Sequence, residues 1–376
     1  MPDTVPLDAV RSPVPDLLFE DQREARIDEI RDLLEAPERL DARTPLHRLT
    51  VFLTYRCNLA CPYCKTIARS LAELRARPEK GLTYTLDDFR RLLDGYAGTP
   101  IRHLHFTGGE ASLVRELPAM VRLARARGVE AVSLTTNGTL PPARYLELIA
   151  AGLNELRVSI DAADAALGRK LTERDGAFEA TLATIRGLAQ ARRESAGARF
   201  FLILNTVVSR DNAPRLPEIL RFLLALGPDD LKLIADVDAR GRLAEPEEAR
   251  KLTEALAELV AALPAGGFPL LRRKLRTVFA AHAIGLEDVP APARGGWRCY
   301  VPLTERTVDG RYYYPCSVYL REGGAPLGRL DDPPGVQRAK SAAFARRGDC
   351  LSDPVCRRYC LHCTKNYNVR CNEERL

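Results

Sequence analysis

Three cysteines in one short loop are the residues of this 376-residue sequence that most clearly predict chemistry. Cys57, Cys61 and Cys64 follow an apolar, strand-like run with the spacing C-x3-C-x2-C. Three thiolates on one loop can bind three irons of a cubane [4Fe–4S] cluster and leave the fourth iron without a protein ligand. Zinc is the alternative, but a structural zinc site needs a fourth ligand, such as His103 or His105. The spacing therefore predicts an iron–sulfur site with one open iron.

Seven further cysteines follow near the C-terminus and predict additional metal binding. They are Cys299, Cys316, Cys350, Cys356, Cys360, Cys363 and Cys371. A cubane held only by protein takes four thiolates, so the seven exceed the needs of one such cluster by three. Cys299 and Cys316 flank Asp309-Gly310, a dipeptide typical of a β-hairpin turn. A zinc-ribbon-like structural site is the alternative for this region.

Strand-like and helix-like stretches alternate between these two groups of cysteines. The expected strands are Leu49–Leu53, Ile101–Phe106, Val129–Thr135, Glu155–Ile160, Phe200–Val208 and Asp230–Ile234. Expected helices are Leu113–Arg127, Ala143–Ala151, Ala177–Arg193, Leu216–Leu226, Glu247–Leu263 and Leu270–His282. This alternation is typical of an α/β protein with a parallel sheet and crossover helices. Residues Asp21–Glu35 have helical spacing and predict a helix on the outside of the main domain.

Short polar motifs follow several of the expected strands, where the strands of a parallel sheet place functional groups. Gly108-Gly109-Glu110 combines two glycines, which allow close backbone approach, with a carboxylate that can pair with an ammonium group. Thr135 and Asn137 end the third strand, and Ser159 and Asp161 end the fourth. Each motif is also compatible with an ordinary turn, and Asn205 on the fifth strand with a buried strand position.

Composition limits the class of protein. The net charge of +6 is spread over 56 basic and 50 acidic residues, and no basic run is interleaved with aromatic residues, so nucleic acid is not an expected partner. The N-terminus lacks the layout of a signal peptide, and no apolar run approaches the ~18 residues of a membrane span. Ten cysteines without a secretion signal indicate metal or redox chemistry in a reducing compartment. We expect a cytoplasmic protein that does not bind membranes.

The C-x3-C-x2-C loop, read together with the motifs that follow it, resembles the radical S-adenosylmethionine (radical SAM) enzymes. The resemblance covers residues 49–235 and implies a partial (β/α)6 barrel of the TIM type. It implies that SAM binds the open iron through its amino and carboxylate groups. The SAM contacts implied by the resemblance are Tyr63 at adenine, Gly108, Gly109 and Glu110 at the amino group, and Thr135, Asn137, Ser159, Asp161 and Asn205 around the ribose and carboxylate.

The C-terminal cysteines resemble the auxiliary-cluster regions called twitch and SPASM domains. Cys299 and Cys316 with Cys360 and Cys363 resemble the twitch layout, which holds one auxiliary cluster. Cys350-x5-Cys356-x3-Cys360 matches the last three positions of the SPASM signature, but Arg347 stands where its first cysteine would be. We expect Cys350, Cys356 and Cys371 to hold a second, incomplete cluster. Ser317 stands where sulfatase-maturing relatives carry an aspartate base, so no catalytic base is assigned.

The expected organisation has four parts. Residues 1–45 form an N-terminal helical extension, and 46–268 form the barrel. Residues 269–294 form a bridging helix and linker, and 295–376 form a cysteine-rich β-hairpin and helical domain for auxiliary clusters.

The expected function is radical SAM catalysis of the oxidoreductase or epimerase type. SAM would be cleaved reductively, and its 5′-deoxyadenosyl radical would take hydrogen from a C–H bond. A small polar substrate from natural-product biosynthesis (a sugar, aminocyclitol, nucleoside or amino-acid unit) is the first expectation, because no peptide-binding module is visible. Modification of a ribosomal peptide or protein side chain is the alternative, and a non-catalytic Fe–S or zinc regulator is the competing class. A flavodoxin- or ferredoxin-type donor would supply electrons.

Overall fold

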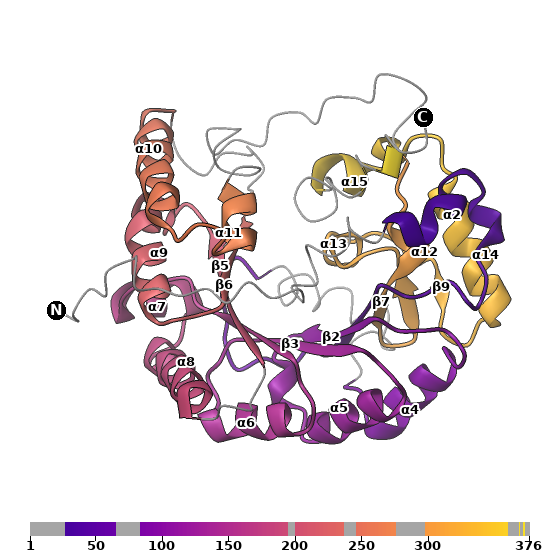
Figure 1. Cartoon of the computed structure of the whole chain (residues 1–376), viewed down its shortest axis with the longest axis horizontal. Coiled ribbons are helices and arrows are strands. Elements are labelled where there is room, and N and C mark those ends of the chain that lie inside the picture. Colours follow the sequence, from indigo (N-terminus) through magenta and orange to yellow (C-terminus); the bar gives the residue numbers. More distant parts are fainter. Residues whose placement is uncertain are drawn as a thin grey trace.

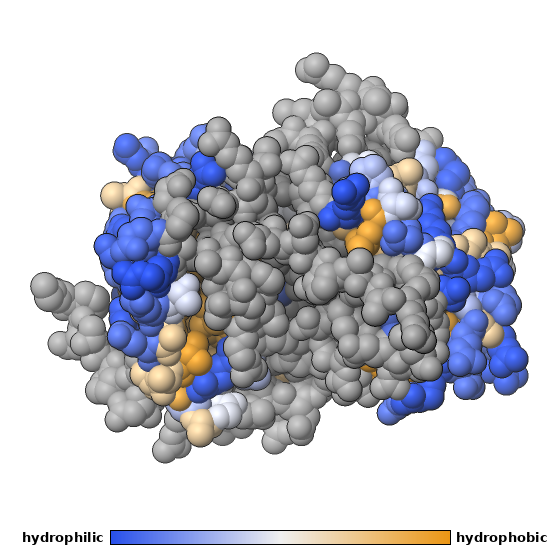
Figure 2. All heavy atoms as spheres, turned by 90° about the horizontal axis from the view of Figure 1, so that it is seen from above, coloured by the Kyte–Doolittle hydropathy of each residue, from blue (hydrophilic) through white to orange (hydrophobic). Residues whose placement is uncertain are grey.

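A computed structural model describes residues 27–64, 83–194, 200–236, 246–275, 298–359, 368 and 371–372 of the chain. Within these residues, no helix combines the length and the apolar character that crossing a bilayer requires. On the face shown in Figure 2, the described side chains at the two flanks are mainly hydrophilic, and smaller apolar patches lie within each flank.

Six parallel strands form the barrel part of the sheet, as the sequence predicts. They are β1 (Arg48–Thr54), β2 (His103–Gly108), β3 (Ala131–Thr136), β4 (Glu155–Ser159), β5 (Phe201–Val208) and β6 (Asp230–Ala235). Neighbours in sequence are neighbours in the sheet, and each pair is parallel. Parallel pairing places the C-terminal ends of all six strands at one edge. The predicted partial barrel is confirmed.

Helices cover the outer side of this sheet (Figure 1). They are α4 (Leu86–Asp94), α5 (Leu117–Ala126), α6 (Pro142–Ala150), α7 (Ala165–Thr172), α8 (Ala177–Glu194), α9 (Leu216–Ala225) and α10 (Pro246–Ala262). The sequence analysis did not predict α4, although Thr85 and Asp88 form a capping box at its start. Leu104 and Phe106 of β2 belong to the apolar core shared with these helices. His103 and His105 alternate with these two residues along β2. They therefore lie on the other face of the sheet, because side chains alternate along a strand.

The C-terminal lobe continues the barrel sheet instead of forming a separate one. Strand β7 (Glu305–Asp309) pairs in parallel with β1, and β8 (Tyr312–Tyr314) and β9 (Gly328–Arg329) follow in antiparallel order. The predicted hairpin at Asp309-Gly310 is confirmed, and it lies beside the end of β1. Helices of the lobe are α12 (Val301–Thr304), α13 (Ser317–Arg321), α14 (Pro334–Ala345) and α15 (Pro354–Tyr359).

The N-terminal helical segment packs on the C-terminal lobe as well as on the barrel, where Glu29 contacts His47 and Arg102. It consists of the 3-10 turn η2 (Ile27–Ile30) and α2 (Arg31–Glu35), followed by the 3-10 turn η3 (Pro37–Arg39). Its four apolar side chains share one buried cluster with Tyr300 and Phe344 of the lobe. Phe52 of β1 belongs to the same cluster, so the predicted packing on the main domain is present, and the contact with the lobe is an addition that helical spacing could not reveal. In Figure 1 α2 accordingly lies beside α12 and α14.

The described part of the bridging helix is α11 (Pro269–Lys274). The rest of the predicted helix and linker, residues 276–294, lies outside the described residues. The buried Asp230 of β6 accepts hydrogen bonds from the backbone N–H groups of Leu270 (2.8 Å) and Leu271 (3.1 Å). This carboxylate at the helix N-terminus fixes α11 to the last barrel strand.

Candidate iron–sulfur and SAM site

The cysteine loop follows β1 and is held from two sides. Cys57, Cys61 and Cys64 are half-buried free thiols. Asn58 donates a hydrogen bond to Thr139 (2.8 Å) and accepts one from Asn137 (2.8 Å), so the loop after β3 holds one side. On the other side, the backbone N–H of Ala60 donates to the carbonyl of Thr172 at the end of α7 (3.1 Å). Asn58 and Thr139 escaped the sequence analysis, since neither belongs to a recognisable motif.

The three thiols lie in a setting that favours binding to a cationic group. Burial, followed by the charge of Asp161, raises the pKa of Cys61 to about 12. Burial also raises the pKa of Cys57. Thiolates in such a place need positive charge nearby, which the irons of a cluster supply. In the described part of the chain no three donors converge as they would on a single metal ion. A cubane is bound differently, through thiolates on separate irons, and the three cysteines fit it.

The two glycines of the Gly-Gly-Glu motif allow β2 to approach the start of the cysteine loop. Gly109 donates its N–H to the carbonyl of Thr54 (2.6 Å), and Glu110 donates its N–H to the carbonyl of Arg56 (2.8 Å). A Cβ on Gly108 would lie 2.3 Å from the Thr54 oxygen, and one on Gly109 would lie 2.4 Å from the Arg56 oxygen. The two glycines therefore lie close against the backbone just before Cys57, as expected of residues without a side chain.

Glu110 is buried and its carboxylate already has three donors. It accepts hydrogen bonds from the backbone N–H of Ser112 (3.0 Å), the hydroxyl of Thr136 (2.7 Å) and the backbone N–H of Asn137 (2.6 Å). Burial raises its pKa. Glu110 thus fixes the loop that carries Asn137, whose amide lies 3.9 Å from the sulfur of Cys57. Its contact with the SAM amino group remains a prediction.

Replacing Glu110 by alanine should weaken SAM binding without removing iron. The variant loses a carboxylate that orders the Asn137 loop and is expected to meet the SAM ammonium. Hydrogen bonds to a charged group are worth ~1.5–3 kcal/mol, so affinity should fall by roughly one to two orders of magnitude. Equilibrium dialysis with SAM and iron analysis on the same samples would measure both. Unchanged affinity with a lowered melting temperature would leave Glu110 a purely structural role.

Tyr63 and Asp161, two predicted SAM contacts from distant parts of the sequence, lie together. The Tyr63 hydroxyl donates to Asp161, whose other oxygen accepts from the backbone N–H of Val207 (2.7 Å). Burial raises the pKa of Asp161 to about 6. This pair joins the cysteine loop to the ends of β4 and β5.

The raised pKa of Asp161 predicts a pH-dependent stability. The folded chain keeps a proton that the unfolded chain releases near pH 3.8, so this contribution is present below pH 3.8 and is lost as the pH rises through about 6. The shift corresponds to about 3 kcal/mol. We expect Asp161→Asn, which cannot ionise, to lack this loss between pH 4 and pH 7. Urea unfolding of both proteins without SAM, at several pH values, measures this effect. A difference in unfolding free energy between them that stays constant from pH 4 to pH 7 would show that Asp161 does not titrate.

Ser159 and Asn205 occupy neighbouring positions on β4 and β5. Asn205 is only 4% exposed, yet its side-chain oxygen has no hydrogen-bond partner among the described residues. A buried amide oxygen without a donor is unusual in a native protein and indicates a missing ligand or water. The predicted role of Asn205 as a SAM contact fits this observation. Ser159, the last residue of β4, and Thr135 of β3 are half-buried.

The two histidines of β2, named above as possible zinc ligands, support the barrel instead. His103 and His105 both lie at hydrogen-bond distance from the Ser133 hydroxyl (2.6 and 2.7 Å). The second ring nitrogen of His105 lies 3.2 Å from the Thr135 hydroxyl. Burial, together with surrounding cations, holds the pKa of His105 well below its usual range, so the ring is neutral. Neither histidine therefore stands beside the cysteine thiols as a zinc ligand.

The described C-terminal cysteines lie close together in the lobe, and the predicted division between two clusters stays a prediction. Cys299, Cys316 and Cys356 line one small cavity between α13, α14 and α15. Cys356 interacts with Cys350, which lowers its pKa. Cys371 is buried in the same apolar cluster, whereas Cys360 and Cys363 lie outside the described residues. Cys356 thus lies near Cys350, with which it is predicted to share a cluster, and also beside the hairpin pair Cys299 and Cys316.

Comparison with known proteins agrees with this site. A profile of the radical SAM superfamily matches residues 51–223. The GTP 3′,8-cyclase of Xanthomonas campestris pv. campestris (strain 8004) is 34% identical over 181 residues, which cover 48% of this chain and 51% of the relative. The PqqA peptide cyclase of strain B100 of the same organism is 33% identical over 183 residues, covering 48% and 44%. This chain thus spans about half the length of these curated relatives.

Two groups of solved structures share the fold over most of the chain. Streptococcus suis SuiB bound to S-adenosylmethionine has a TM-score of 0.54 at 13% identity, covering 86% of this chain and 70% of SuiB. The enzyme anSMEcpe with bound AdoMet and a Cp18Cys peptide has a TM-score of 0.55 at 15% identity, covering 80% and 82%. The SPASM-type arrangement of the C-terminal lobe is confirmed at the level of the fold.

Residues 51–223 of this chain form a radical SAM domain. The cofactors of this domain are a [4Fe–4S] cluster and SAM. Auxiliary clusters in the C-terminal lobe stay a prediction. When bound, the first cluster supplies an electron that cleaves SAM and produces a radical able to take hydrogen from carbon. Cys57, Cys61 and Cys64 would hold that cluster. The chain's own contribution is to fix the cysteine loop against β2, β3 and α7 and to place Tyr63, Asp161 and Asn205 at the strand ends.

Proposed function

We propose that this radical SAM enzyme oxidises a side chain of a peptide or protein. The observation that carries the proposal is the extent of the fold that this chain shares with peptide-bound anSMEcpe. The shared fold covers 82% of the anSMEcpe chain. A peptide-bound enzyme of this fold thus has little structure beyond what this chain shares with it. The lack of a recognisable peptide-binding module favoured a small substrate in the sequence analysis. It is therefore no longer an argument against a peptide substrate.

The position of the C-terminal lobe supports oxidation as the net reaction. Strand β7 pairs with β1, and Asp309 at the hairpin accepts a hydrogen bond from the hydroxyl of Tyr55 (2.8 Å). Tyr55 precedes Cys57 by only two positions, so the cysteine-rich lobe adjoins the cysteine loop directly. One hydrogen atom would leave the substrate with the deoxyadenosyl group. A second electron and a proton would then leave as the auxiliary region accepts the electron, which gives a product two hydrogens lighter.

A small polar substrate is the second candidate, favoured by the identity to GTP 3′,8-cyclases over the barrel. One experiment separates the two. Extract from cells grown in deuterated medium is divided by ultrafiltration into peptide and small-molecule fractions, and each is incubated anaerobically with reconstituted enzyme, SAM and dithionite. Mass spectrometry then follows deuterium in 5′-deoxyadenosine. We expect deuterium from the peptide fraction; transfer from the small-molecule fraction alone would overturn the proposal in favour of the second candidate.

The cysteines of the lobe offer a further prediction. We expect Cys356→Ala, like Cys299→Ala and Cys316→Ala, to lower auxiliary iron and substrate turnover together, because the three thiols line one cavity. Iron analysis and product analysis on each variant provide the test. If Cys356 were instead a hydrogen donor, its loss would leave iron unchanged, and product formed in deuterated water would carry deuterium at the reacting carbon.

A further inference from the structure

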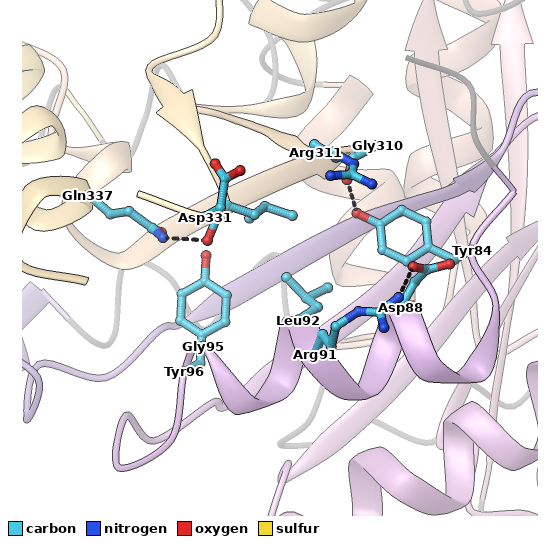
Figure 3. A pocket seen from close by; sticks show the side chains of 11 residues that line it. Tyr84, Asp88, Arg91, Leu92, Gly95, Tyr96, Gly310, Arg311, Asp331 and Gln337 are labelled. Atoms are coloured by element: carbon cyan, nitrogen blue, oxygen red, sulfur yellow. Dashed lines mark hydrogen bonds and ion pairs between the residues drawn. The ribbon is translucent and has the colours of Figure 1, made fainter. Parts of the chain in front are cut away.

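A second cavity lies away from the cysteine loop, between the barrel and the C-terminal lobe. It has a volume of about 540 Å³, within the usual range for small-molecule sites. Helix α4 forms one wall, and the hairpin turn, the segment after β9 and α14 form the other (Figure 3). None of its lining residues belongs to the predicted SAM site.

Polar groups at the base of this cavity lack suitable partners. The hydroxyl oxygen of Tyr96 is shielded from solvent and has no hydrogen-bond partner in the described part of the chain. Arg306 lies beside it in an adjoining small cavity that also borders Tyr96 and Gln337. Arg306 is 4% exposed and donates to the backbone carbonyls of Pro302 and Glu305, and no described carboxylate forms an ion pair with it. A buried cation without an anion is costly unless a ligand supplies one.

The rim of the cavity, like its base, has a cation without a paired anion among the described residues. Asp88 is paired with Arg91 (2.6 Å), and Asp331 is paired with Arg329 (2.9 Å). Arg311, at the hairpin turn, has no ion pair among the described residues, and Figure 3 shows it above the side chain of Tyr84. Both acidic groups are therefore already neutralised locally, whereas Arg306 and Arg311 are not.

The walls between base and rim are largely apolar. Leu92, Leu330 and the rings of Tyr84 and Tyr96 form them. We propose that this cavity binds a carboxylate carried on an apolar body, with the carboxylate toward Tyr96 and Arg306. A dianionic phosphate fits less well, because it would bring a second charge against walls that are largely apolar. The carboxylate belongs either to a free organic acid or to the end of a peptide.

Such a ligand would connect the two parts of the enzyme. Tyr84 donates its hydroxyl to the carbonyl of Gly310, and the neighbouring Asp309 accepts from Tyr55 near the cysteine loop. A bound carboxylate would therefore bridge α4 and the hairpin that contacts that loop. Because it binds only the folded protein, it should also raise the melting temperature.

The test uses phenylacetate, its uncharged analogue phenylacetamide, and a tripeptide ending in phenylalanine as the free acid or the amide. Calorimetric titration of the reconstituted enzyme should show each acid binding at least about tenfold more tightly than its amide, since charged hydrogen bonds are worth ~1.5–3 kcal/mol. Stronger binding of the peptide acid would assign the carboxylate to a peptide, and stronger binding of phenylacetate would assign it to a free acid.

Two variants and a control localise the binding. Tyr96→Phe should weaken acid binding while keeping the ring. Gly95→Leu should abolish it, because Gly95 has helical backbone angles that accept any side chain and lines the cavity. Gly335→Ala, whose added Cβ meets nothing within 4 Å, should bind like the wild type. Equal affinity for acid and amide, no binding of either acid, or full binding by Gly95→Leu would overturn the proposal.

Discussion

Replacing Cys57, Cys61 and Cys64 by alanine is expected to abolish 5′-deoxyadenosine formation and to remove about four irons per chain. These three thiols, on a loop fixed by Asn58 and Ala60, are the ligands proposed for the first cluster. Without them, no iron remains to bind and reduce SAM. The auxiliary iron should stay, because no C-terminal cysteine lies in this loop. Iron analysis and chromatography of the SAM products on the same reconstituted samples would measure both effects.

Alanine replacement of a thiol is a small change, so this variant should keep its fold. Its circular dichroism spectrum and its auxiliary iron serve as the controls. Full 5′-deoxyadenosine formation by the triple variant would show that the SAM-cleaving iron is held elsewhere. Loss of all iron together with the fold would show that the first cluster stabilises the barrel as well.

The second large effect is expected from Gly109→Ala. A Cβ at this position would lie 2.4 Å from the carbonyl oxygen of Arg56 and 2.8 Å from its carbon. These are backbone atoms one residue before Cys57, so they cannot yield as the end of a flexible side chain could. The cysteine loop must move away from β2, and the hydrogen bond from Gly109 to Thr54 is lost. We expect SAM cleavage to fall by two orders of magnitude or more, on the order of 3 kcal/mol in barrier.

Gly335→Ala is the matched control, because its new Cβ has open space around it. Turnover of SAM by both variants under identical reconstitution would separate a specific collision from a general effect of the substitution. Wild-type rates for Gly109→Ala would mean that the strand and the loop are not in close contact in the working enzyme.

Local sequence signals predicted much of this molecule. Alternating strands and helices identified all six barrel strands within a few residues, because a parallel sheet buried on both faces leaves continuous apolar runs. Motif order placed Tyr63 and Asp161 in one site, and the structure brings them into hydrogen-bond contact. Asp309-Gly310 predicted the hairpin through its turn chemistry.

Contacts between distant segments were not predictable in the same way. No local pattern indicates that β7 pairs with β1, or that the N-terminal helix packs on the C-terminal lobe. The sequence shows that Glu110 carries a charge, but not that Ser112, Thr136 and Asn137 already occupy its oxygens. Cysteine spacing likewise left open which thiols share a cavity. These features depend on tertiary packing, which spacing along the chain does not record.

The most direct test of the central claim is the fate of SAM in an anaerobic reaction of the wild-type protein. After reconstitution with iron and sulfide, the enzyme is incubated with SAM and dithionite, and 5′-deoxyadenosine and methionine are quantified by mass spectrometry. Reductive cleavage at the open iron predicts that both products form in equal amounts and only when iron is bound. A protein that retains zinc in place of iron after reconstitution, and leaves SAM intact, would contradict the account.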